Sequence, residues 1–75
     1  MDAKTRFKIE DKIEAMLQEN GREYDLHKEA ARQLEDELLF VKEEDDRHTF
    51  LRAHKSRMVF LNGASSALYE LKGAL

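Results

Sequence analysis

The stretch KEEDDRHT, from Lys42 to Thr49, decides the fold, because the pattern of hydrophobic residues changes phase inside it. Continued through this stretch, the earlier phase would bury charged side chains such as Arg52 and Lys55. A reversal of the chain avoids that burial, and Asp45 or Asp46 can cap the next helix by accepting hydrogen bonds from its free N–H groups. The earlier phase follows steps of three and four, the spacing of one helix face: Ile9, Ile13, Met16, Asn20, Tyr24, His27, Ala31, Leu34, Leu38 and Val41.

A second phase begins after the reversal and continues to the C-terminus. No stretch alternates between apolar and polar residues over a useful length, so strands are not expected. Both phases are typical of amphipathic helices, and the sequence predicts an all-α protein. The second face consists of Phe50, His54, Leu61, Ala64, Leu68, Leu71 and Leu75, widened by Ala53, Met58 and Phe60.

The charges on the two sides of the reversal predict that the helices run antiparallel. From Glu35 to Asp46 there are seven acidic residues and one basic residue, Lys42. From Arg47 to Arg57 there are four basic residues and no acidic one. Both groups oppose the dipole of their own helix, and folding back lets them compensate each other. Each exposed pair contributes only about 0.2–1 kcal/mol, so these pairs favour register and orientation more than stability.

Two Asn-Gly pairs leave the number of helices open. At Asn20–Gly21 we predict a turn, because glycine is preferred just past a helix end and Asn-Gly is a strong turn signal. This turn divides the single domain, residues 1–75, into helices at about 4–19, 22–44 and 47–73, a three-helix bundle. The alternative is one long first helix, and hence a two-helix hairpin with an overhang. At Asn62–Gly63 we predict a continuous helix, because the apolar phase passes through and no capping box restarts a helix.

The composition favours a small soluble domain that gains stability by association. The chain has 75 residues, of which 41% are hydrophobic and 39% charged, a net charge of −3 and no cysteine. A core of this size supplies roughly 3–5 kcal/mol unless disulfides, metals or oligomerisation reinforce it. We therefore expect the hairpin or bundle to complete a larger bundle by self-association, as a homodimer. The charged N-terminal segment and the lack of an apolar run of ~18–20 residues predict a cytoplasmic protein without a membrane span.

The residues that carry chemistry do not form a recognisable catalytic or metal motif. Ser65 follows Gly63 by two positions, but a nucleophile elbow needs a second glycine where Ala67 stands. Glu23 and His27 lie one helical turn apart, but a di-metal bundle needs Glu-x-x-His, which does not occur. We interpret His27 as a neutral histidine packed in the core. The sequence thus predicts no enzymatic activity, no metal and no cofactor.

Large apolar side chains outside the main helix faces predict a surface for a protein partner. Within LLFV (Leu38–Val41), Leu39 and Phe40 project to the two sides of the apolar row, and a helix that is apolar most of the way round must be covered from more than one direction. An N-terminal helix packing through Phe7 and Leu17 would cover part of this surface. The predicted function is a non-enzymatic interaction module, acting as a regulator, inhibitor or assembly adaptor. Its predicted partner contacts are Leu39, Phe40, Arg57, Val59 and Tyr69.

The basic segment from Arg47 to Arg57 supports an alternative function in nucleic-acid binding. The acidic run that precedes it would repel phosphates, so we favour a face that is neutralised within the protein. Arg57 falls inside the apolar row, where it can extend its head to solvent, pair with a carboxylate of the preceding helix or of a second copy, or contact a partner. In the alternative function, four cations would contact phosphates: Arg47, Arg52, Lys55 and Arg57.

Overall fold

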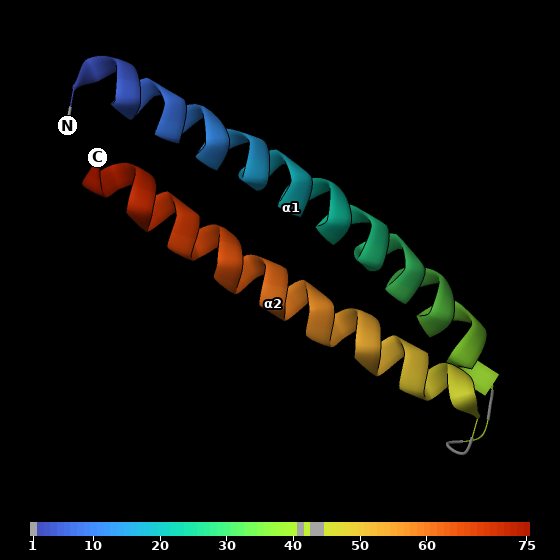
Figure 1. Cartoon of the computed structure of the whole chain (residues 1–75). Helices are drawn as coiled ribbons and strands as arrows, with labels where there is room; N and C mark the ends of the chain where they lie inside the picture. The colour runs from blue at the N-terminus through green and yellow to red at the C-terminus, as the bar shows by residue number, and fades with distance from the viewer. Residues whose placement is uncertain (1, 41, 43–44) are drawn as a thin grey trace.

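The structure, a computed structural model, describes residues 2–40, 42 and 45–75, without the side chain of Phe40, and forms a helical hairpin. Helix α1 spans Ala3–Glu37, the 3-10 helix η1 spans Leu38–Phe40, and helix α2 spans Asp46–Ala74. The two long helices pack side by side and antiparallel, and both chain ends lie at one end of the rod (Figure 1). No strand occurs in the described ranges. The prediction of an all-α antiparallel hairpin is therefore confirmed.

The predicted break at Asn20–Gly21 is wrong. Helix α1 continues through both residues as one helix of 35 residues, so helices at about 4–19 and 22–44 do not form and the two-helix alternative is correct. The side chain of Asn20 is half-buried, and its Nδ2 donates a hydrogen bond to Oγ of Ser65 in α2 at 3.4 Å. Packing at this position favours the helix over the turn, because one internal glycine costs only about 1 kcal/mol relative to alanine. Through Asn62–Gly63, α2 is continuous as predicted.

The chain reversal lies in the predicted stretch, but α1 ends earlier than residue 44. The backbone N–H of Leu38 donates to the carbonyl oxygen of Leu34 and closes the helix. Acids at the C-terminal end of α1 oppose its dipole and disfavour further extension. Residues 41, 43 and 44 of the predicted helix lie outside the described part. Asp45 caps α2 as predicted, and the hydrogen bonds that its carboxylate accepts from the side chain and backbone N–H of Arg47 lower its pKa to about 2.

The core is a narrow seam between the two helices. Up to Leu38 the predicted first row is correct except at Met16, which is 54% exposed while the neighbouring Leu17 is half-buried; Val41 lies outside the described residues. On α2 the prediction needs correction, because four of its predicted core residues, Phe50, Ala53, Phe60 and Leu71, are exposed. In the described ranges the buried apolar side chains are Ile13, Ala31, Leu38 and Leu61. The residues of α2 that face α1, which we call the inner row, are Leu51, His54, Met58, Leu61, Ser65, Leu68, Lys72 and Leu75.

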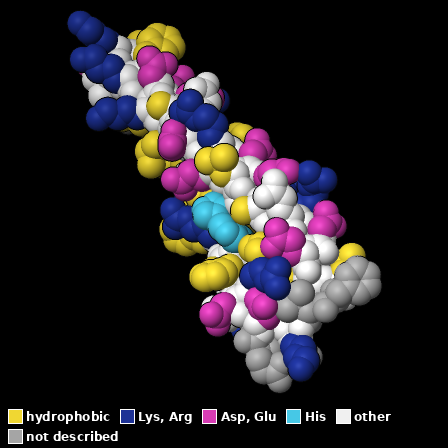
Figure 2. Space-filling model, turned by 90° about the vertical axis from the view of Figure 1, so that its right-hand side faces the viewer, with side chains coloured by type: hydrophobic (Ala, Val, Ile, Leu, Met, Phe, Trp, Pro, Cys, Tyr) yellow, Lys and Arg dark blue, Asp and Glu magenta, His cyan; other side chains and the backbone are white. Residues whose placement is uncertain are grey.

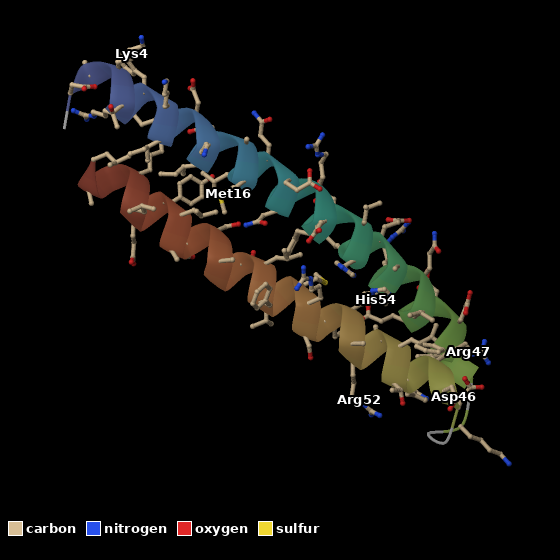
Figure 3. All side chains as sticks on the ribbon, viewed as in Figure 1. Lys4, Met16, Asp46, Arg47, Arg52 and His54 are labelled. Carbon is tan, nitrogen blue, oxygen red and sulfur yellow. The ribbon has the colours of Figure 1, made fainter. Side chains whose placement is uncertain are left out.

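Ion pairs across the seam bear out the predicted compensation of charge. The Nζ of Lys55 lies 2.7 Å from a carboxylate oxygen of Glu35, and Arg47 lies against the end of α1 (Figure 3). These side chains are substantially exposed, so each pair adds about 0.2–1 kcal/mol and mainly sets the register. The pairs join Arg47 to Glu37, Lys55 to Glu35, Arg57 to Glu23 and Lys72 to Glu14.

Charged side chains of both signs are spread along the face seen in Figure 2, with hydrophobic groups between them. Within residues 2–40, 42 and 45–75, neither helix contains a segment that is long and apolar enough to cross a lipid bilayer.

Candidate interaction surface

A second apolar row runs along α2 beside the inner row, and we call it the outer stripe. Each of its residues immediately precedes an inner-row residue in the sequence, so it lies about 100° further round the helix. Seven of its eight residues are apolar. Its three largest apolar side chains, Phe50, Phe60 and Leu71, are 57%, 59% and 50% exposed, although the sequence placed them in the core. The outer stripe consists of Phe50, Ala53, Arg57, Phe60, Ala64, Ala67, Leu71 and Ala74.

The single charge in the outer stripe is matched within the hairpin. The Nη2 of Arg57 donates to Oε2 of Glu23 on α1 at 3.2 Å. Its guanidinium carbon also lies 4.8 Å from the centroid of the Phe60 ring, within the range of a cation–π contact. Of the roles considered for Arg57, the structure therefore shows the pair with a carboxylate of the preceding helix. The outer stripe thus carries one positive charge, which Glu23 on α1 offsets.

The same ion pair shows which side of α1 borders the outer stripe. Because Arg57 pairs with Glu23, the outer stripe and the row of α1 that contains Glu23 lie on the same side of the hairpin. The positions seven residues before and after Glu23 share that side of the helix. They are Met16, which is 54% exposed, and Ala30, which is half-buried. The apolar surface thus extends from α2 onto α1.

The five predicted partner contacts do not form one surface. Arg57 lies in the outer stripe, but Val59 and Tyr69 are 72% and 62% exposed at positions of α2 outside it. Leu39, also 72% exposed, lies in η1 at the turn end of the rod. The side chain of Phe40 lies outside the described part.

Sequence reasoning missed the outer stripe because it merged two neighbouring rows into one broad face. The available signal was a series of adjacent residue pairs, such as Phe50–Leu51 and Phe60–Leu61, repeating at steps of three and four. A row that faces α1 cannot also include the residue just before each of its members, because successive residues differ by about 100° around the helix.

The basic segment is largely engaged within the protein. Arg47 binds Asp45 and lies near Glu37, and Lys55 and Arg57 pair with carboxylates of α1. Arg52 points away from α1 (Figure 3), with its Nη2 3.4 Å from Oγ1 of Thr49. These four cations therefore do not converge on one site. On the other side of the seam, a pocket of about 230 Å³ is bordered by charges of both signs from Lys28, Arg32, Glu35 and Lys55.

Two histidines meet across the seam at mid-length. The Nδ1 atoms of His27 and His54 lie 2.8 Å apart, and His54 is seen between the helices in Figure 3. One Nδ1 must donate and the other must accept, so at least one ring is neutral at that nitrogen. Both rings are half-buried rather than sealed in a core. In the part of the chain that the structure describes, no group of three or more side chains suited to a metal ion occurs.

No protein-family model matches this chain, and the searches of curated proteins and of solved structures also gave no match.

Proposed function

We propose that this protein is a non-enzymatic interaction module that binds other protein surfaces through the outer stripe of α2. The observation that carries this proposal is the stripe itself: seven apolar residues and one neutralised arginine at the spacing that helix packing uses. A regulator, an inhibitor or an assembly adaptor would all act in this way, by presenting a helix face.

The amount of exposed surface supports a binding role. The chain exposes 5956 Å². A compact monomer of 8.8 kDa exposes about 4,800 Å² by the usual scaling of area with mass. The difference exceeds the roughly 800 Å² that each partner contributes to a standard interface. The rod-like shape, 58 × 15 × 14 Å, accounts for this excess and leaves the apolar side chains of one flank uncovered.

Self-association is the simplest use of this surface. Two hairpins packed side by side would form a four-helix bundle, an architecture in which apolar rows at steps of three and four fill a common core. The cytoplasm is the compartment we propose, since a chain without cysteine needs no oxidising environment.

Nucleic-acid binding is the weaker candidate. Phosphate binding requires basic side chains that can exchange counterions for phosphates. Three of the four cations considered already lie beside carboxylates, so phosphates would have to compete with them.

Sedimentation of the wild type and of Phe60→Glu tests the proposal. Phe60 is 59% exposed in the hairpin, so a glutamate there should leave the helical content unchanged by circular dichroism. We expect the wild type to sediment as a dimer and Phe60→Glu as a monomer. The matched control is Ser66→Glu, which adds the same charge at an exposed position of α2 outside the outer stripe.

A wild type that remains monomeric at millimolar concentration would overturn self-association. Capture of a cellular protein by the wild type but not by Phe60→Glu would then support a heterologous partner on the same stripe. Equal behaviour of Phe60→Glu and Ser66→Glu in both assays would remove the outer stripe from the binding surface.

A further inference from the structure

We infer that the occupant of the outer stripe is a second copy of this chain, packed antiparallel to the first about a two-fold axis near Asn62 and Gly63. This inference rests on the self-association proposed above and adds its orientation and register. It follows from the order of large and small residues in the stripe.

In an antiparallel pair of outer stripes, large residues of one copy lie opposite small residues of the other. When two copies of α2 lie antiparallel and centred on Asn62, every layer joins one large side chain and one alanine. Alternation of large and small residues across facing positions is what lets helices interdigitate without voids. The layers pair Phe50 with the partner's Ala74, Ala53 with the partner's Leu71, Arg57 with the partner's Ala67, and Phe60 with the partner's Ala64.

A parallel arrangement of the same stripe would lose this complementarity. Each residue would then face its own copy, so phenylalanine would meet phenylalanine and alanine would meet alanine. Arg57 would also face a second Arg57, which costs energy in a desolvated seam. In the antiparallel register the two arginines lie about 15 Å apart along the helix axis, because each is five residues from the two-fold axis.

Gly63 fits a close approach of the second copy. A Cβ atom built on Gly63 meets nothing within 4 Å, so the packing of the hairpin does not require glycine there. In helical projection Gly63 lies at the edge of the outer stripe, between Phe60 and Ala67 along the helix. In the proposed register it lies one residue from the two-fold axis, so the two copies of Gly63 are about 3 Å apart along the helix axis. Glycine and alanine at this level allow the two backbones to come together.

The exposed area agrees with a second copy as the occupant. Two separate hairpins expose far more surface than the roughly 7,900 Å² of a compact protein of twice the mass. The stripe spans nearly the whole of α2, from Phe50 to Ala74, and a two-fold axis uses it twice in a single interface. The pair of Arg57 with Glu23 reduces the repulsion between the two facing stripes.

Opposite charges at position 67 test the register. In the antiparallel dimer, Ala67→Arg places a positive charge against the partner's Arg57, whereas Ala67→Glu provides a counter-ion for it. We expect the dissociation constant of the dimer, measured by sedimentation equilibrium, to be at least tenfold higher for Ala67→Arg than for Ala67→Glu. Ser66→Arg and Ser66→Glu, at a neighbouring exposed position outside the stripe, should differ little.

Within one hairpin, the two substitutions affect helix stability in the opposite order. The expected difference between the dimers therefore cannot come from helix stability. An arginine at position 67 lies three residues before Glu70 and would form a favourable pair with it, whereas a glutamate would be repelled. Tighter dimers for Ala67→Glu therefore report the second copy and not helix stability. Equal dissociation constants, or tighter dimers for Ala67→Arg, would overturn the antiparallel register while leaving self-association in place. A wild type that never dimerises would overturn both.

Discussion

The row of α2 that faces α1 is more polar than the row that faces outward. The inner row includes His54, Ser65 and Lys72, whereas the outer stripe has only Arg57 among its eight residues. In an isolated hairpin the reverse distribution would be more stable, since burial of apolar surface contributes about 25 cal/mol per Å². The comparison supports the proposal that the outer stripe of α2 is a second interface.

The largest effect is expected when one large side chain of each row is truncated to alanine and the two losses of stability are compared. Leu61 is 2% exposed, and Leu61→Ala should cost about 2–5 kcal/mol, most or all of the stability of so small a domain. Thermal unfolding followed by circular dichroism should show this loss at every protein concentration. Phe60→Ala should instead lower the midpoint mainly at concentrations where the wild type is dimeric. Equal losses for the two variants at all concentrations would contradict the assignment of Phe60 to a separate interface.

Gly21 and Gly63 are both open in the hairpin, but only Gly63 lies near the proposed two-fold axis, and this difference gives a smaller contrast. Neither Gly21 nor Gly63 has an atom within 4 Å of an added Cβ, so alanine should raise the stability of either helix by up to about 1 kcal/mol. For Gly21→Ala this gain should appear at all protein concentrations. For Gly63→Ala it should shrink where the protein is dimeric, because the methyl group separates the two copies. Equal gains for both variants at all concentrations would argue against a close approach at Gly63.

The smallest expected effect is on the melting temperature and comes from Asp45, the N-cap of α2. Because hydrogen bonds from Arg47 lower the pKa of Asp45 to about 2, the carboxylate stabilises the fold fully above the ordinary aspartate pKa of about 3.9. This contribution is lost as the pH falls through about 2, where the folded protein takes up the proton. Asp45→Asn keeps a capping side chain but removes the charge. The difference in melting temperature between wild type and variant should therefore shrink from pH 5 to pH 2.

The sequence was sufficient for the features that depend on local pattern and charge. The phase change before Phe50, the cap at Asp45 and the opposed charges of Glu35 and Lys55 each have a local cause, and each is found in the hairpin. The predicted turn at Asn20–Gly21 was wrong because the turn signal is local, whereas in the helix Asn20 packs across the seam and contacts Ser65, which is distant in sequence.

The candidate surface was harder to predict than the fold. A helical projection places Phe60 and Leu61 on one broad face, and only the position of α1 separates them. Exposure alone also misleads, since Val59 is more exposed than Phe60 but does not belong to the outer stripe. The position of a neighbouring helix depends on packing over the whole length of both helices, which no short pattern contains.

The hairpin brings both chain ends to one end of a rigid rod (Figure 1). In an antiparallel dimer the two pairs of chain ends point in opposite directions, whereas in a parallel dimer they lie together. Proteins fused to the N-terminus would accordingly be held apart by a spacer nearly 60 Å long, the length of the rod being 58 Å. Fluorophores attached at Asp2 would then transfer energy poorly between copies, although the copies are in contact along most of α2.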